Sequence, residues 1–137
     1  MIKILIADDY APFRQVLEDF LETADTRLKV TARATNGKEA LHVVQNASID
    51  VAIIDIRMPI MDGLELTRHL RAAWGNSLGI ITYTGLRSAL LTEQALLAGA
   101  NLHLVKPFEL FALKDSVIRL GEANKRGTLT QKRARVV

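Results

Sequence analysis

The amino-acid sequence predicts an α/β fold: a single doubly wound sheet of five parallel strands, with five helices covering its two faces. The first observation is that short apolar runs and apolar residues at helical spacing alternate five times along the 137 residues. The second is that the connections are short, with turn sequences such as Asn36-Gly37, Asp62-Gly63 and Gly99-Ala100-Asn101 between the elements. Short connections between alternating elements favour right-handed crossovers and parallel strands.

Five strands are expected, at residues 2–7, 28–34, 50–55, 79–83 and 101–105. The third and fourth are rich in isoleucine, and the third also contains valine, which is typical of parallel strands that are buried on both faces. A charge has no place inside such a strand, so we expect the third strand to end at Asp55.

Five helices are expected, at residues 12–24, 37–47, 63–73, 87–98 and 109–122. The first has apolar residues at helical spacing, and Pro12 suits a first helical position. Apolar periodicity is lost after Leu120. We therefore expect one domain over residues 1–122 and, over 123–137, a basic flexible tail or the start of an interdomain linker.

Composition excludes several classes of site. The chain contains no cysteine, so disulfides, thiolate nucleophiles and zinc–cysteine sites are ruled out. No apolar run approaches the roughly 18 residues of a membrane span, and residues 1–7 are too short for a signal peptide. The expectation is a cytoplasmic protein with no membrane partner.

The net charge of +3 comes from the C-terminal end of the chain. Residues 1–124 hold thirteen basic and fifteen acidic residues, whereas residues 125–137 hold five basic and no acidic ones. Direct nucleic-acid binding by residues 1–122 is therefore not expected.

Polar residues stand where four of the expected strands end. Asp8 and Asp9 follow the first, Asp55 ends the third, Thr84 follows the fourth and Lys106 follows the fifth. Open parallel sheets bind ligands at the carboxyl edge. Three carboxylates without imidazole or thiolate suit Mg²⁺, while a lysine and a hydroxyl suit phosphoryl oxygens. A carboxylate can also act as a nucleophile and become an acyl phosphate.

Each residue alone has a plainer interpretation. An Asp-Asp pair after a strand is most often a turn or a helix cap, and Lys-Pro is usually a solvated turn. Asp62 beside Gly63 is expected to cap a helix rather than to bind a ligand. The joint pattern, with four strand ends at one edge, favours a shared site.

These residues carry a family resemblance. The matching stretches are Ile4–Asp9, Ile54–Gly63, Thr82–Gly85 and Gly99–Phe108. In them the chain resembles the receiver domains of two-component response regulators, over residues 2 to about 122. The resemblance implies a flavodoxin-like receiver fold with strand order 2-1-3-4-5.

The resemblance also implies residue roles. Asp55 would be the phosphoacceptor, receiving a phosphoryl group from a histidine kinase or a phosphotransfer protein. Asp9, Asp55 and the backbone carbonyl of Arg57 would bind Mg²⁺ directly, and Asp8 would act through a metal-bound water. Lys106 would pair with the phosphoryl group and Thr84 would donate its hydroxyl to it. The Lys106–Pro107 peptide is a candidate for the cis form.

Three positions depart from the family pattern. His103 stands three residues before Lys106, where receivers usually carry a switching tyrosine or phenylalanine, and it is either a secondary switch residue or a tolerated surface substitution. Arg57 and Leu86 lie two residues after Asp55 and Thr84, at positions that tune dephosphorylation in the family. We expect slow self-dephosphorylation.

The resemblance implies a signalling phosphoacceptor rather than an enzyme, with only its own Mg²⁺-dependent phosphorylation and dephosphorylation chemistry. Phosphorylation would switch the face formed by the fourth helix, fifth strand and fifth helix, which would engage an effector domain, a partner protein or a second copy in a homodimer. One alternative is the receiver portion of a longer DNA-binding transcriptional regulator. Others are a Mg²⁺-dependent aspartyl-phosphate hydrolase and a degenerate receiver that is not phosphorylated.

Overall fold

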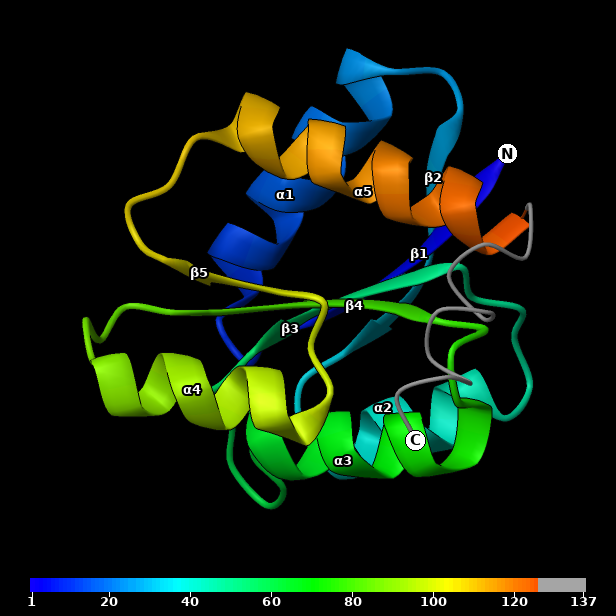
Figure 1. The fold of residues 1–137 in the computed structure, drawn as a ribbon. Coiled ribbons are helices and arrows are strands. Elements are labelled where there is room, and N and C mark those ends of the chain that lie inside the picture. Colours follow the sequence, from blue (N-terminus) through cyan, green and yellow to red (C-terminus); the bar gives the residue numbers. More distant parts are fainter. Residues whose placement is uncertain (126–137) are drawn as a thin grey trace.

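The computed structural model describes residues 1–125, which form three layers with a parallel sheet between two layers of helices (Figure 1). The elements, in chain order, are β1 (Ile2–Ala7), α1 (Ala11–Ala24), β2 (Leu28–Ala34), α2 (Gly37–Val44), β3 (Val51–Asp55), α3 (Gly63–Trp74), β4 (Gly79–Thr84), α4 (Ala89–Ala98), β5 (Leu102–Val105) and α5 (Leu110–Lys125). The predicted α/β fold is confirmed.

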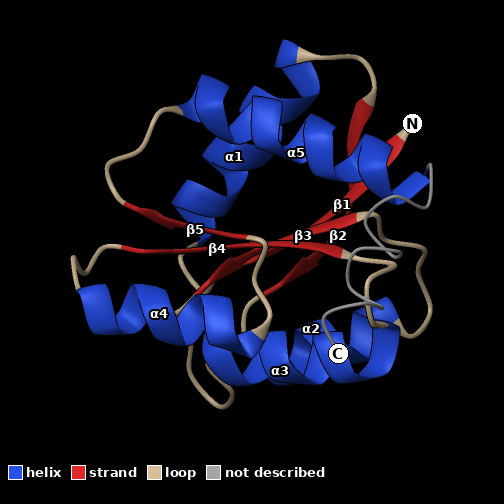
Figure 2. Cartoon of the chain, viewed as in Figure 1, coloured by secondary structure: helices blue, strands red, loops and turns tan. Residues whose placement is uncertain are grey.

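The sheet has the order β2-β1-β3-β4-β5, and all of its neighbouring strands are parallel. The predicted strand order 2-1-3-4-5 is therefore confirmed. Figure 2 shows α1 and α5 on one face of the sheet and α2, α3 and α4 on the other. The chain leaves β1 for β2 on one side and then crosses to β3 on the other side of β1. This crossing point is where open α/β sheets bind ligands.

Each face of the sheet has its own apolar core. Side chains such as Leu5, Ile54 and Ile80 pack under α2, α3 and α4, while Ile6, Ile53 and Ile81 pack under α1 and α5. β3 is buried along its whole length, as its Ile/Val-rich sequence predicts. β2, at one edge of the sheet, alternates buried and exposed residues instead.

Some predicted boundaries are shifted. α2 ends at Val44 rather than residue 47, and α4 begins at Ala89 rather than residue 87 because the Ser88 side chain caps it by accepting the Leu91 N–H at 3.1 Å. α5 continues to Lys125 instead of ending at residue 122. Two ion pairs hold this last turn, Glu122 with Arg27 at 3.0 Å and Lys125 with Asp50 at 3.4 Å.

Three residues of the expected tail are thus helical. Residues 126–137, the rest of it, lie outside the described residues, so the expected basic flexible tail or linker remains a prediction. Within residues 1–125, none of the helices has the length and the apolar run that crossing a membrane requires.

The loop from β3 to α3 is held tightly against the end of β3. Asp62 caps α3 as predicted, since its side chain accepts the Glu65 N–H at 2.9 Å. Gly63 donates its N–H to the Ile56 carbonyl at 2.8 Å, and a Cβ at this position would lie only 2.3 Å from the Asp55 carbonyl oxygen. Only glycine permits this approach, which keeps the segment after Asp55 close to the strand end.

The same loop contains a strained residue. Ile60 has φ = 71°, in the left-handed region, although it is β-branched and 79% exposed. Its side chain gains little from burial, so most of the conformational cost is uncompensated.

Replacing Ile60 by asparagine, which tolerates this conformation, is expected to increase the free energy of unfolding by about 1 kcal/mol. Urea unfolding monitored by circular dichroism measures the change. Ile60→Val is the matched control and should leave the stability unchanged, because valine is also β-branched. A loss of stability in Ile60→Asn would contradict this interpretation.

Candidate functional site

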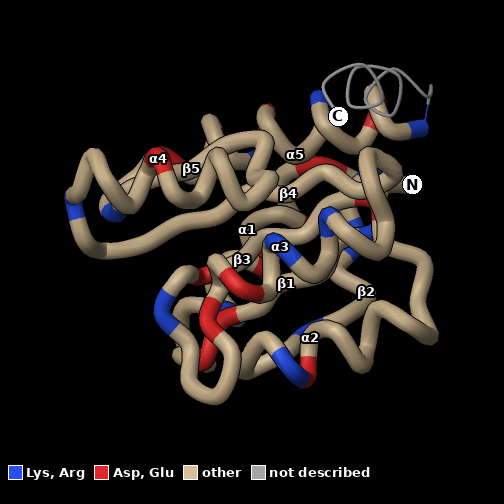
Figure 3. The backbone as a smooth tube through the Cα atoms, turned by 60° about the horizontal axis from the view of Figure 1, so that its bottom comes forward, with Lys and Arg blue, Asp and Glu red and all other residues tan. Residues whose placement is uncertain are grey.

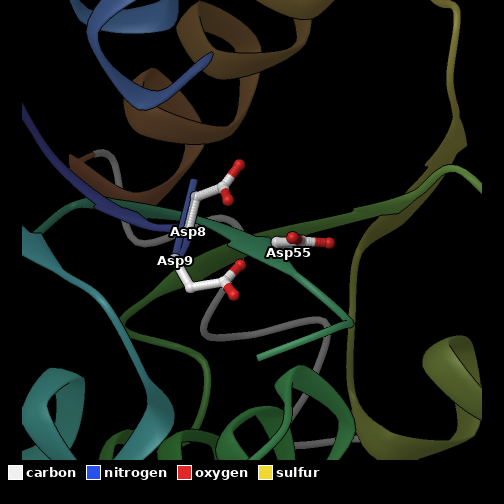
Figure 4. A group of neighbouring side chains, drawn as sticks. All are labelled: Asp8, Asp9 and Asp55. Carbon is white, nitrogen blue, oxygen red and sulfur yellow. The ribbon is translucent and has the colours of Figure 1, made fainter. Parts of the chain in front are cut away.

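Three carboxylates meet at the carboxyl edge of the sheet. β1 and β3 are neighbours in register, with Ala7 opposite Ile54, so Asp8 and Asp55 follow paired residues. Asp8, Asp9 and Asp55 each offer an oxygen, and these atoms all lie within 4.8 Å of one another. Figure 4 shows the Asp8 and Asp9 side chains diverging from the end of β1 while both extend in the direction of Asp55.

The environment of this carboxylate cluster disfavours the ionised form of Asp55. Asp8 is completely buried, Asp55 is 9% exposed and Asp9 is exposed. Burial, and next the negative charge of Asp8, raise the pKa of Asp55 to about 7. The Arg57 N–H, which donates to Asp55 Oδ1 at 3.2 Å, and the charge of Lys106 act in the opposite direction. They do not overcome burial and the charge of Asp8.

The cluster fits a hard divalent cation. It provides three carboxylates from two adjacent strands, and no imidazole or thiolate belongs to it. Oxygen-only ligands of this kind are those of Mg²⁺, which keeps several waters as well. The exposed Asp9 leaves one side of the cluster open to solvent. Figure 3 shows red segments gathered beside β3 and α3, while the blue segments are scattered over several elements.

Asp8 has more partners than the sequence indicates. Its Oδ1 accepts the Tyr10 N–H at 2.8 Å, and its Oδ2 accepts the hydroxyl of Tyr83. Its main-chain carbonyl accepts a hydrogen bond from Arg14 at 2.6 Å. Tyr83 is a residue that sequence reasoning missed. Strand alternation places it on the opposite face of the sheet from Thr84, but which carboxylate it meets depends on the three-dimensional position of β4.

Lys106 lies beside the cluster without an ion pair to any of the described residues. Its Nζ is 3.7 Å from the centroid of the Phe13 ring and 5.1 Å from that of Tyr83. Cation–π attraction therefore holds the ammonium group on aromatic faces. The Lys106–Pro107 peptide is cis, as expected.

Thr84 is fully buried at the end of β4. Its hydroxyl oxygen accepts the N–H of Leu86 at 3.3 Å, and its carbonyl accepts the N–H of Lys106 at 2.8 Å. The ends of β4 and β5 are thereby tied together, so Thr84 and Lys106 share the edge that the sequence predicted. The side chains of Arg57 and Leu86 both face solvent near this edge.

His103 lies on β5 opposite Thr82 of β4 and is half-buried. Its Nδ1 is 2.8 Å from the Thr82 hydroxyl oxygen, and desolvation by burial lowers its pKa. Thr82 and His103 face the helix layer that contains α4, because the neighbouring residues Leu102 and Leu104 belong to the opposite core. His103 is therefore a partly enclosed, hydrogen-bonded imidazole rather than a surface side chain.

Comparison with known proteins identifies the family and the fold. The sequence model described as "Response regulator receiver domain" matches residues 4–118. The receiver domain of the Francisella response regulator 1452 shares 31% identity and a TM-score of 0.80, with 89% of this chain and 98% of that chain covered. A response regulator receiver domain protein from Clostridium thermocellum shares 26% identity and a TM-score of 0.81, with coverage of 91% and 98%.

Curated relatives are larger proteins. A protein-glutamate methylesterase/protein-glutamine glutaminase from Nocardioides sp. is 37% identical over 124 residues, which are 89% of this chain and 33% of that protein. The sensor protein EvgS of Escherichia coli is 40% identical over 119 residues, 87% of this chain and 10% of that protein. The chain thus spans a third or less of the length of these relatives. On the family match, the relatives and the shared fold, the chain belongs to the response regulator receiver domains of two-component signalling.

Proposed function

We propose that Asp55 is the phosphoacceptor of this receiver, and that it takes a phosphoryl group from a phosphohistidine of a histidine kinase or phosphotransfer protein in a Mg²⁺-dependent reaction. The observation that carries the proposal is the position of Asp55 beside Asp8 and Asp9, with ligand oxygens within 4.8 Å, at the sheet edge that also presents Lys106 and Thr84. No other group of acidic, histidine or cysteine side chains in residues 1–125 has this geometry.

The reaction is a displacement at phosphorus. A carboxylate oxygen of Asp55 forms the new P–O bond, the P–N bond to the donor imidazole breaks, and the imidazole leaves with the electron pair. An anionic nucleophile and an anionic phosphoryl group repel each other. A bound Mg²⁺ supplies the positive charge that offsets this repulsion. Asp9, Asp55 and the Arg57 carbonyl would hold the ion directly, and Asp8 through a water.

Two further residues would act on the transferred group. The charge of Lys106 acts to lower the pKa of Asp55, and Lys106 would leave the faces of Phe13 and Tyr83 to pair with phosphoryl oxygens. The Thr84 hydroxyl, whose oxygen accepts the Leu86 N–H, would donate its own proton to a phosphoryl oxygen. Both movements involve the ends of β4 and β5, which gives phosphorylation a route to α4 and to His103.

The surface near that route suits a protein partner. α4 exposes Leu90, Leu96 and Leu97, which are 65%, 48% and 79% accessible, and Leu86 precedes it. As the family resemblance implies, the face formed by α4, β5 and α5 is the proposed output surface, for an effector domain, a separate protein or a second copy. Relatives with a matching segment include a methylesterase and a sensor protein, so an enzyme domain or another signalling module is the proposed effector. A DNA-binding effector is the alternative.

Incubation with acetyl phosphate and Mg²⁺ is expected to add one phosphoryl group to the wild-type protein, measured by intact mass. Asp55→Asn should gain none, because the nucleophilic oxygen is lost. Asp62→Asn is the matched control: this carboxylate caps α3 outside the cluster, so the variant should be modified like the wild type. Absence of modification in the wild type, or modification of Asp55→Asn, would contradict the proposal. Turnover of p-nitrophenyl phosphate would indicate a hydrolase instead.

Stability should depend on pH through Asp55. Its pKa rises from 3.8 to about 7 on folding, so the folded state holds the proton more tightly than the unfolded chain. The resulting stabilisation is complete below about pH 4 and disappears as the pH rises through 7. Asp55→Asn removes this dependence and should be more stable than wild type at pH 8 by about 2 kcal/mol or more.

Urea unfolding at several pH values, without Mg²⁺, measures this difference. Saturating Mg²⁺ at high pH should reduce the difference in the free energy of unfolding between wild type and Asp55→Asn. The cation offsets the charge of all three carboxylates in the wild type, whereas the variant has only two. If wild type and Asp55→Asn differed in stability by the same amount at low and high pH, the role of Asp55 ionisation would be contradicted.

The phosphorylated protein is expected to lose its phosphoryl group over minutes or longer. Arg57 and Leu86 place a long cation and an apolar side chain at the solvent side of the site. Neither side chain has a hydrogen-bond acceptor that could orient an attacking water. Leu86→Asn should shorten the lifetime, with Leu96→Asn on α4 as the control, because Leu96 is 48% exposed and Leu86 is 50% exposed. Phosphate release in the presence of Mg²⁺ measures the rate. A wild-type half-life of only seconds would refute this expectation.

A further inference from the structure

Tyr83 is the largest of the completely buried side chains in residues 1–125 and stands next to the carboxylate cluster. It lies near the end of β4, with its ring in the core beneath α1 and α5. The ring packs edge-on against Phe13, at a centroid distance of 5.6 Å, and in a tilted arrangement against Phe108 at 5.7 Å. These contacts fix the ring and therefore the direction of its hydroxyl.

The hydroxyl of Tyr83 is directed at a single carboxylate. It donates to Asp8 Oδ2, while Asp8 Oδ1 accepts the Tyr10 N–H at 2.8 Å. Both side-chain oxygens of Asp8 are thus engaged, and the side chain is completely buried. Burial and the charge of Asp8 raise the pKa of Tyr83 above its usual range, so the phenol keeps its proton and remains a donor.

No cation within residues 1–125 forms an ion pair with the Asp8 carboxylate. The ammonium group of Lys106 sits over the rings of Phe13 and Tyr83 and forms no ion pair with the described residues. Arg14 contacts the main-chain carbonyl of Asp8 rather than its carboxylate. In the part of the chain that the structure describes, the Asp8 side chain accepts one hydrogen bond from a backbone N–H of the adjacent loop and one from Tyr83. The hydroxyl of Tyr83 is therefore the side-chain group that fixes the orientation of this buried acid.

We propose that Tyr83 is a positioning residue for divalent-cation binding, because its hydroxyl holds the Asp8 carboxylate in the orientation that completes the cluster with Asp9 and Asp55. The inference rests on the proposed function and deepens it, since it concerns the same site. The aromatic ring alone would fill the core between Phe13 and Phe108. What the hydroxyl adds is a fixed, hydrogen-bonded carboxylate at the sheet edge, and outer-shell partners of this kind strengthen metal binding about 10- to 100-fold.

Tyr83→Phe tests the inference, because it removes the hydroxyl and keeps the ring on which Lys106, Phe13 and Phe108 pack. Titration of the metal-free protein with MgCl₂ in a calorimeter should show binding about tenfold weaker than in the wild type. Tyr10→Phe is the matched control, because Tyr10 is the other tyrosine and is 62% exposed. Its contact with Asp8 is made by the backbone N–H, which phenylalanine keeps, so the affinity should be unchanged. Equal or tighter binding by Tyr83→Phe would overturn the inference.

A second pair of variants separates positioning from a general packing defect. In an Asp8→Asn background, Tyr83→Phe should change the Mg²⁺ affinity by less than about twofold, because the carboxylate on which the hydroxyl acts is gone. A further loss of about tenfold in that background would show that Tyr83 acts independently of Asp8 and would overturn the inference.

The wild-type titration distinguishes failure of the proposed Mg²⁺-dependent function from failure of the proposed role of Tyr83. Suppose that the wild type binds Mg²⁺, that Asp9→Asn weakens the binding and that Tyr83→Phe leaves it unchanged. This result would support the proposed function and contradict only the role of Tyr83. Absence of Mg²⁺ binding in the wild type would contradict both, since there would be no cation for the cluster to hold.

Discussion

The adjacency of β1 and β3 is the constraint on which the site depends. Because Ala7 pairs with Ile54, the residues that follow them meet, and three carboxylates come to lie with oxygens within 4.8 Å of one another. Two of the three are almost completely buried, and like charges in such surroundings resist ionisation, as the raised pKa of Asp55 shows. The fold thereby places excess negative charge at this edge, which a divalent cation and the ammonium group of Lys106 could both offset.

The residues around the cluster hold the Asp8 carboxylate and the Lys106 ammonium group by two different kinds of contact. Asp8 is held by hydrogen bonds from Tyr10 and Tyr83, whereas Lys106 is kept on the faces of aromatic rings and off the carboxylates. Tyr83 takes part in both arrangements, through its hydroxyl and its ring. Under the proposed function, a lysine that forms no ion pair with the described residues would be free to pair with a phosphoryl group on Asp55. The geometry thus separates the residues that prepare the site from those that would respond to its modification.

Much of the fold could be predicted because its signals are local. Apolar runs, turn residues and the acids at the strand ends each lie within a few positions, and they indicated the parallel sheet and the shared edge. The contact of Tyr83 with Asp8 could not be predicted, because it joins β4 to the end of β1 across β3. The helical turn at Lys125 was also missed: its ion pair with Asp50 is distant in sequence, and the local loss of apolar periodicity suggested an earlier end. Long-range polar contacts leave no periodic pattern.

The proposed function requires that Asp55 become an acyl phosphate. Borohydride reduces an acyl phosphate to an alcohol and so converts a phosphorylated aspartate into homoserine, which peptide sequencing by mass spectrometry locates. After phosphorylation with a small-molecule donor and Mg²⁺, the account predicts homoserine at position 55 and nowhere else. Homoserine at position 8 or 9, or a phosphorylated protein that borohydride leaves unchanged, would contradict it.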